Sequence, residues 1–213
     1  MFRIVTIERE FGCGGACIAE HLAQRLHWKL YDQQLTEEIA RLAKVDPAQV
    51  MRCDERVDSR LYRLSKVFWR GSYERSLPLS DSQPFDADCM VQMVQQVVEQ
   101  AAQSGECVLV GRGAPFFLRQ RDDTFHVFLY ASRPEKVGRL LAAGKSQEEA
   151  EELIDTVDAE RVEFIKHYFN ANWPTRSLYH MMLNTAVGDD TVVQTILDTM
   201  QRVSEAKTAK VSR

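Results

Sequence analysis

The chain has 213 residues, of which 45% are hydrophobic and 27% charged, a balance typical of a soluble globular protein. The net charge of −4 argues against a nucleic-acid binder that works by bulk positive charge, although a local basic pocket stays open. No apolar run approaches the roughly 20 residues of a membrane span, and no signal-peptide pattern is present. We therefore expect a cytoplasmic protein whose residues 1–213 form one domain with an insert.

The cysteines and histidines do not indicate a metal site. The five residues of each type lack the spacing of a zinc site or of a disulfide framework, so no protein-bound metal is predicted. Reduced thiols are the simplest interpretation. Cys13 and Cys17 fall where a helix is expected to begin, a position that favours thiolates, so a redox switch stays open beside inert small side chains.

Strands and helices are expected to alternate along the chain. Short β-branched and apolar runs predict strands at residues 3–7, 29–31, 107–110, 126–130 and 180–183. Apolar residues at helical spacing predict helices at residues 18–26, 33–43, 90–102, 134–143, 146–169 and 192–200. This alternation favours a parallel sheet covered on both faces. The polar tail from Glu205 is expected to fray, and the arginine-rich residues 54–86 are interpreted as a partly helical insert.

The chain opens as a strand, a glycine-rich turn and a helix. Such a turn can cradle a phosphate with backbone N–H groups and the positive end of the helix. The P-loop pattern G-x-x-x-x-G-K-[ST] is not met, because with Gly14 as the second glycine its other defining positions hold Arg9, Gly15 and Ala16. These residues alone leave a phosphate site and an ordinary strand-to-helix turn equally open.

Polar residues follow several of the predicted strands. Glu8–Glu10, Asp32, Arg112 and Asn184–Thr185 stand at strand ends. Because the carboxyl ends of parallel strands share one edge, where ligands bind in open α/β sheets, these residues are expected to converge. Arg112 lies between two glycines, which suits either a bidentate anion ligand or a structural ion pair.

Three features of the second half have structural interpretations. Asp158 and Arg161 share a helix face, and a solvated ion pair within the helix is the simplest interpretation. Ser146-x-x-Glu149 is a capping-box pattern. Trp173, which precedes Pro174, suits a packed corner better than a base-stacking platform.

The order and spacing of these segments resemble the cytidylate kinase-like family, a branch of the nucleoside monophosphate kinases. The resemblance covers about residues 3–200. It is carried by residues 7–15, 31–32, 108–113, 127–131, 158–161, 173 and 179–185. It implies the three-layer α/β fold of P-loop NTPases: a parallel five-stranded sheet with helices on both faces. It also implies a helical insert after the second strand, at about residues 45–90, and a lid-like helical segment at about residues 139–165.

The resemblance also implies an activity, the ATP- and Mg²⁺-dependent phosphorylation of a nucleoside monophosphate, typically CMP or dCMP. The implied partners are these nucleotides, and neither a nucleic acid nor a membrane is expected to bind. The formation of a homo-oligomer is left open. The residues matched to the donor nucleotide are Gly12, Cys13, Gly14, Gly15, Ala16 and Cys17. Asp32 and Arg112 match acceptor-binding positions. Arg139 and Arg161 match lid arginines, and Asp158 matches the aspartate before the latter.

The sequence also departs from the family pattern. Gly15 stands in place of the P-loop lysine, and Ala16 and Cys17 offer no hydroxyl to Mg²⁺ or phosphate. Gly113 replaces the aspartate of a glycine-arginine-aspartate motif, and Ile154 replaces a further lid arginine.

Arg9 is the candidate replacement for the missing lysine, and the alternative is that it pairs with a carboxylate. The departures keep two further functions open. The chain could be a catalytically silent nucleotide-binding sensor, or a kinase for another small acceptor.

Overall fold

We describe the protein from a computed structural model that covers residues 1–32 and 87–211. The predicted helix at residues 33–43 and the predicted insert up to residue 86 lie outside the described residues. None of the helices within these ranges is long and apolar enough to cross a membrane.

Five parallel strands form one sheet with the order β2-β3-β1-β4-β5. They are β1 (Ile4–Arg9), β2 (Lys29–Tyr31), β3 (Cys107–Val110), β4 (Thr124–Tyr130) and β5 (Met181–Asn184). The central strand β1 pairs with β3 and with β4, so that Ile4 lies opposite Cys107 and Thr124. The predicted parallel sheet is confirmed.

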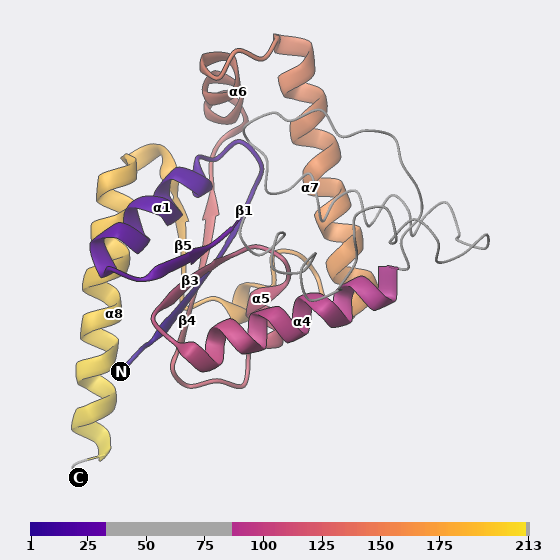
Figure 1. Ribbon diagram of the computed structural model, residues 1–213. Coiled ribbons are helices and arrows are strands. Elements are labelled where there is room, and N and C mark those ends of the chain that lie inside the picture. The colour runs from indigo at the N-terminus through magenta and orange to yellow at the C-terminus, as the bar shows by residue number, and fades with distance from the viewer. Residues whose placement is uncertain (33–86, 212–213) are drawn as a thin grey trace.

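Helices cover both faces of the sheet (Figure 1). The helices α1 (Gly15–Leu26) and α8 (Asp189–Val211) cover one face. The other face is covered by α4 (Ala87–Ser104), α5 (Ala114–Phe117) and α7 (Gln147–Phe169). The helix α6 (Arg133–Ala142) and the beginning of α7 form a hairpin beyond the carboxyl edge of the sheet. Two 3₁₀ helices, η2 (Arg176–Leu178) and η3 (Thr185–Val187), flank β5.

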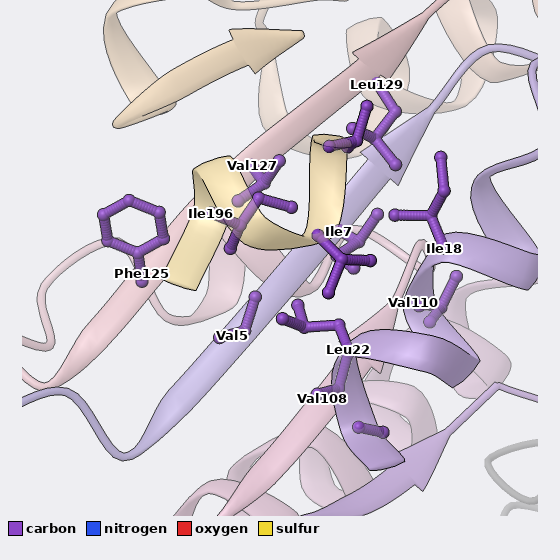
Figure 2. Packing of buried hydrophobic residues seen from close by; sticks show 14 of the residues in the cluster. Val5, Ile7, Ile18, Leu22, Val108, Val110, Phe125, Val127, Leu129 and Ile196 are labelled. Carbon is purple, nitrogen blue, oxygen red and sulfur yellow. The ribbon is translucent and has the colours of Figure 1, made fainter. Parts of the chain in front are cut away.

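Alternating side chains of the strands build the hydrophobic core. Val5 and Ile7 of β1 point to the same face and pack with Ile18 and Leu22 of α1 and Ile196 of α8 (Figure 2). All five are fully buried, and each such side chain contributes about 1.5–3 kcal/mol. This packing holds α1 against β1 and so positions the turn that joins them.

The last helix is longer than the sequence indicated. The predicted fraying from Glu205 is wrong, because α8 continues to Val211. Val203 packs against the core, and Lys207 lies over the Phe2 ring, 4.5 Å from its centroid, while donating to the Asp122 carbonyl at 2.9 Å. These contacts with the beginning of the chain stabilise a segment whose composition alone suggested disorder.

Side-chain caps define the two helices of the hairpin. Ser132 and Glu135 form a reciprocal capping box at the start of α6. At the start of α7 the Glu149 backbone N–H donates to the Ser146 hydroxyl at 3.1 Å, but the Glu149 carboxylate pairs with Lys145 at 2.6 Å. The predicted capping box at Ser146 is therefore only half formed, since Lys145 offers the carboxylate a cationic partner.

Candidate functional site

A glycine turn joins β1 to α1 at the carboxyl edge of the sheet. Gly12 and Gly14 have φ of +76° and +80°, a backbone conformation that favours glycine. Gly14 is the N-cap of α1, and no side chain caps this end with a hydrogen bond in the described structure. The first turn of α1 also lacks an acidic side chain. The N-terminal N–H groups of α1 therefore keep the capacity to bind an anion.

Arg139 reaches this turn from α6. A Cβ atom at Gly14 would lie 1.6 Å from Arg139 Nη1, so the guanidinium occupies the space that a side chain would need. Arg139 Nη2 donates to the Thr185 carbonyl and to Asp189 Oδ1, both at 3.2 Å. Thr185 Oγ1 in turn donates to the Cys13 carbonyl at 2.7 Å. The end of β5, the hairpin and the glycine turn thus meet at one place.

Asp158 links the hairpin to the backbone of the turn. Its Oδ1 accepts from the Phe11 N–H at 2.9 Å and from Arg161 Nη1 at 3.0 Å, and its Oδ2 accepts from Lys136 Nζ at 3.3 Å. Lys136 is 7% exposed and also pairs with Glu10 at 2.6 Å. Sequence reasoning missed Lys136, although its position three residues before Arg139 places both on one face of α6.

Arg161 is buried between α7 and the end of β1. It is 9% exposed, and its Nη1 donates to the Arg9 carbonyl at 2.7 Å. Burial, and then the positive charge of Arg9, lower the pKa of Arg161. The predicted ion pair between Asp158 and Arg161 forms. Its predicted exposure to solvent is wrong, because packing of α7 on the turn buries most of both side chains.

Arg9 crosses under the turn toward β2. A Cβ at Gly15 would lie 2.8 Å from Arg9 Cγ, and one at Gly111 would lie 2.3 Å from Arg9 Nη1, so these glycines make room for the side chain. Arg9 Nη2 lies 3.7 Å from Asp32 Oδ1, and both side chains are largely buried. Of the two alternatives for Arg9, the structure contains the carboxylate pairing, and the carboxylate is that of Asp32.

Arg112 stands in an unusual backbone segment after β3. Gly111, Arg112 and Gly113 all have positive φ, of +67°, +63° and +68°, and Arg112 is 9% exposed. A Cβ at Gly113 would lie 2.9 Å from two atoms of the Phe169 ring. The aspartate that the family resemblance places at this position therefore could not fit without movement of Phe169.

An apolar cluster holds the hairpin against the glycine turn. It contains Phe11 of the turn, Leu140 of α6, and Ile154 and Val157 of α7, each no more than 5% exposed. Ile154 stands where the resemblance expects a further lid arginine. The hairpin thus contacts the turn through hydrophobic packing at a place where the family pattern would put a charge.

Glu8 forms a second buried site on the opposite face of β1 from Arg9. Its Oε2 accepts from Trp173 Nε1 at 3.2 Å, whereas its Oε1 has no hydrogen-bond partner among residues 1–32 and 87–211. Burial raises the pKa of Glu8, against the opposing effect of Arg9 and Arg161. Trp173 packs on Phe128, with ring centroids 5.3 Å apart, which confirms the predicted packed corner.

The two cysteines of the turn differ in environment. Cys13 is buried, and its Sγ lies 3.7 Å from the Leu129 carbonyl. Cys17 is exposed and lies 3.9 Å from His21 Nε2. Burial, followed by the nearby Asp189, raises the pKa of the Cys17 thiol. These two effects act against the charged form of Cys17, in the direction opposite to the effect of the helix start.

The geometry brings together most of the residues singled out from the sequence. Within the described ranges, residues 12–17 span the turn and the start of α1, Arg9 and Asp32 lie beneath the turn, and Arg139, Asp158 and Arg161 approach it from α6 and α7. Arg112 lies beside Gly111, which contacts Arg9. No group of three or more His, Cys, Asp or Glu side chains in these ranges could hold a metal ion. The arrangement suits an anion such as a polyphosphate.

Comparisons with known proteins report on the family and the fold of this chain. A model of the cytidylate kinase-like family matches residues 4–187. No curated protein matches the sequence. An uncharacterized protein from Eubacterium ventriosum ATCC 27560 has a similar structure, with a TM-score of 0.67 and 21% identity over 95% of this chain and 99% of that chain.

Two shikimate kinases have the same fold. The enzyme from Bacteroides thetaiotaomicron has a TM-score of 0.50 and 14% identity over 95% of this chain and 98% of its own. The enzyme from Acinetobacter baumannii, in complex with shikimate, has a TM-score of 0.50 and 14% identity over 95% and 94%. These similarities confirm the predicted α/β fold of P-loop kinases, whereas the roles of single site residues stay predictions.

Proposed function

We propose that this chain, which belongs to the cytidylate kinase-like family, transfers the γ-phosphoryl group of ATP to a nucleoside monophosphate, CMP or dCMP above all. The observation that carries the proposal is the convergence of arginines on the glycine turn. Arg139 lies against Gly14, Arg9 lies against Gly15, and Arg161 binds the Arg9 carbonyl. Phosphoryl transfer needs this kind of positioning and charge neutralisation more than it needs covalent chemistry.

The donor would bind at residues 12–17. Backbone N–H groups at the start of α1 would face the phosphates, and Arg9 and Arg139 would supply the charge that the missing lysine supplies elsewhere. Mg²⁺ would enter with ATP as part of the substrate and would help to neutralise the charge of its phosphates. The Asp158 carboxylate would keep Arg161 in place, since the two already form an ion pair.

The acceptor would bind between Asp32 and Arg112. A guanidinium suits a phosphate because two of its N–H groups can donate in parallel. For Arg9 to reach the donor, its ion pair with Asp32 would have to break. An acceptor that binds the Asp32 carboxylate would compete with Arg9 for it and so release the arginine. This coupling predicts that donor affinity rises when the acceptor is present. We propose that the reaction takes place on free nucleotides in the cytoplasm.

A second candidate function is nucleotide sensing without turnover. The Arg9–Asp32 pair favours it, because an arginine paired with a carboxylate is a poor substitute for a lysine aimed at phosphates. A kinase for another small acceptor is the third candidate. It is favoured by Phe169, which takes the space of the family's aspartate beside Gly113.

The test is a coupled ADP-release assay with Mg·ATP against CMP, dCMP, UMP and AMP. We expect turnover with CMP or dCMP, and a loss of about 10³-fold in Arg161→Ala, the scale for removing a transition-state arginine. The matched control is Arg133→Ala, since Arg133 lies on the same hairpin and its pair with Asp155 is exposed. Arg112→Ala should weaken acceptor binding.

The outcomes separate the candidate functions. Nucleotide binding by calorimetry without ADP release would support the sensor. Turnover only with an acceptor outside the nucleotides would support the third candidate. Unchanged turnover and acceptor affinity in Arg112→Ala would refute the assigned acceptor site, and absence of both binding and turnover would refute the enzyme and the sensor alike.

A further inference from the structure

A cavity of about 260 Å³ opens at the amino-terminal edge of the sheet, the edge opposite the glycine turn. It lies between the segment that precedes β4, the first residues of β4, the segment from η2 to the start of β5, and the end of α8. Water occupies about 30 Å³ per molecule in the liquid. The cavity can therefore hold a small organic molecule, and none of the residues proposed for phosphoryl transfer lines it.

The lining is positively charged, although the chain as a whole carries −4. Arg119, Arg121 and Lys207 supply three cations and Asp122 supplies one carboxylate, and the charge of Arg121 is offset by its ion pair with Asp123 just outside the lining. Arg121 is held in place by Asp123 through two hydrogen bonds, of 3.0 Å and 2.8 Å. Lys207 is held by the Asp122 carbonyl. Fixed cations around a concave surface attract an anion, and they lose less side-chain freedom when it binds.

His180 also lines the cavity. Its Nδ1 accepts from the His126 backbone N–H at 3.0 Å, so the proton of the neutral ring must be on Nε2. Burial, and then the charge of Lys207, lower the pKa of His180. The ring is also stacked on Phe125, with centroids 4.9 Å apart. These contacts hold the imidazole ring in a fixed orientation, with its N–H on Nε2.

Thr124 is an independent sign of a ligand. The residue is 1% exposed and lines the cavity, yet its hydroxyl has no hydrogen-bond partner in the described parts of the chain. A buried hydroxyl without a partner costs about 1–3 kcal/mol. An oxygen atom of a bound molecule would remove that cost once the Thr124 side chain turns its hydroxyl toward the cavity, because the oxygen has almost no solvent-accessible surface in its present position.

We propose that this cavity is a binding site for a small phosphate monoester, separate from the glycine turn. The hydrogen-bond donors of the lining come from several segments of the chain and surround the cavity. This arrangement suits a tetrahedral phosphate, which has more acceptor oxygens, pointing in more directions, than a single carboxylate. The volume left beyond the phosphate suits a small organic group. The site does not depend on the proposed kinase activity.

The test is calorimetric titration of the full-length chain at low salt with ribose 5-phosphate, and with citrate as the carboxylate probe. We expect ribose 5-phosphate to bind and citrate to bind at least tenfold more weakly. Lys207→Gln should weaken ribose 5-phosphate binding about tenfold through loss of one charge contact. Arg202→Gln is the matched control, since Arg202 is exposed on the same helix but does not line the cavity.

A second variant separates ligand binding from folding. Thr124→Val keeps the shape of the side chain but removes the hydroxyl, so it should lower ribose 5-phosphate affinity several-fold without lowering the melting temperature. No binding to the unmodified chain, or binding unaffected by Lys207→Gln and Thr124→Val, would overturn the proposal. Binding that instead disappears in Arg139→Ala would place the anion at the glycine turn, and tighter binding of citrate would overturn the phosphate assignment.

Discussion

The stability of the protein should fall as the pH drops from 7 to 5, and His126 should be a main cause. His126 is 4% exposed, and its Nδ1 lies 2.7 Å from the Thr6 hydroxyl. Burial, and then the neighbouring His180, lower the pKa of His126 from 6.5 to about 4. Between these two values the unfolded chain binds a proton that the folded chain does not.

The size of the effect follows from the gap between the two pKa values. Each unit is worth about 1.4 kcal/mol, so the loss would approach about 3 kcal/mol below pH 4 and reach about 2 kcal/mol at pH 5. Above pH 7 both states hold the ring neutral, and the contribution disappears. The loss therefore occurs as pH falls through 6.5 toward 4, which is the direction expected for a buried neutral base.

Urea unfolding at pH 7 and pH 5 measures this loss. His126→Gln removes the titrating ring, so its stability should fall by about 2 kcal/mol less than that of the unmodified chain between the two pH values. His167→Gln is the control, because His167 is a solvent-accessible residue of α7 outside the hydrophobic clusters. NMR titration of the His126 ring gives an independent midpoint. Equal pH dependence in all three proteins, or a midpoint near 6.5, would refute the reasoning.

Three further substitutions test the site. Gly14→Ala should cost about 1–2 kcal/mol from its positive φ and should also lower ATP affinity by displacing Arg139, as measured by thermal melting and nucleotide titration. Asp158→Asn should cost about 3 kcal/mol in urea unfolding, because Lys136 and Arg161 lose a largely buried partner. Gly113→Asp should destabilise the protein through contact with Phe169, and Phe169→Leu in the same chain should recover part of that loss.

The structure offers a matched control for two of these changes. Gly144 has φ of +88°, and a Cβ there would meet nothing within 4 Å in the described structure, so Gly144→Ala reports the backbone cost alone. Asp155 pairs with Arg133 on the surface of the same helix as Asp158, so Asp155→Asn should cost well under 1 kcal/mol. Equal effects of Gly14→Ala and Gly144→Ala on ATP affinity, or of Asp158→Asn and Asp155→Asn on stability, would contradict the geometric account.

The sequence by itself determined the parallel sheet and, among the described residues, the order of the strands and the longer helices, but not the short helix α5. These features depend on patterns within short segments, such as the apolar run of residues 3–7 or the spacing of Ile18 and Leu22, which the folded chain buries as expected. The glycine turn, Arg112 and Arg161 could be found in the same way, because each stands at a strand end or on a helix face. Here local pattern and resemblance together placed the candidate residues at the carboxyl edge of the sheet, where the structure brings them together.

Only the tertiary structure decided how charges and faces pair over long distances in the chain. Arg9 pairs with Asp32, Lys136 joins Glu10 to Asp158, and the Glu8 carboxylate meets the Trp173 indole. The end of α8 is ordered by contacts with Phe2 and Asp122. The physical reason is the same in each case: side-chain partners are chosen by the packing of segments that the sequence separates, and burial then determines which charges are held and which hydrogen-bonding groups lack partners.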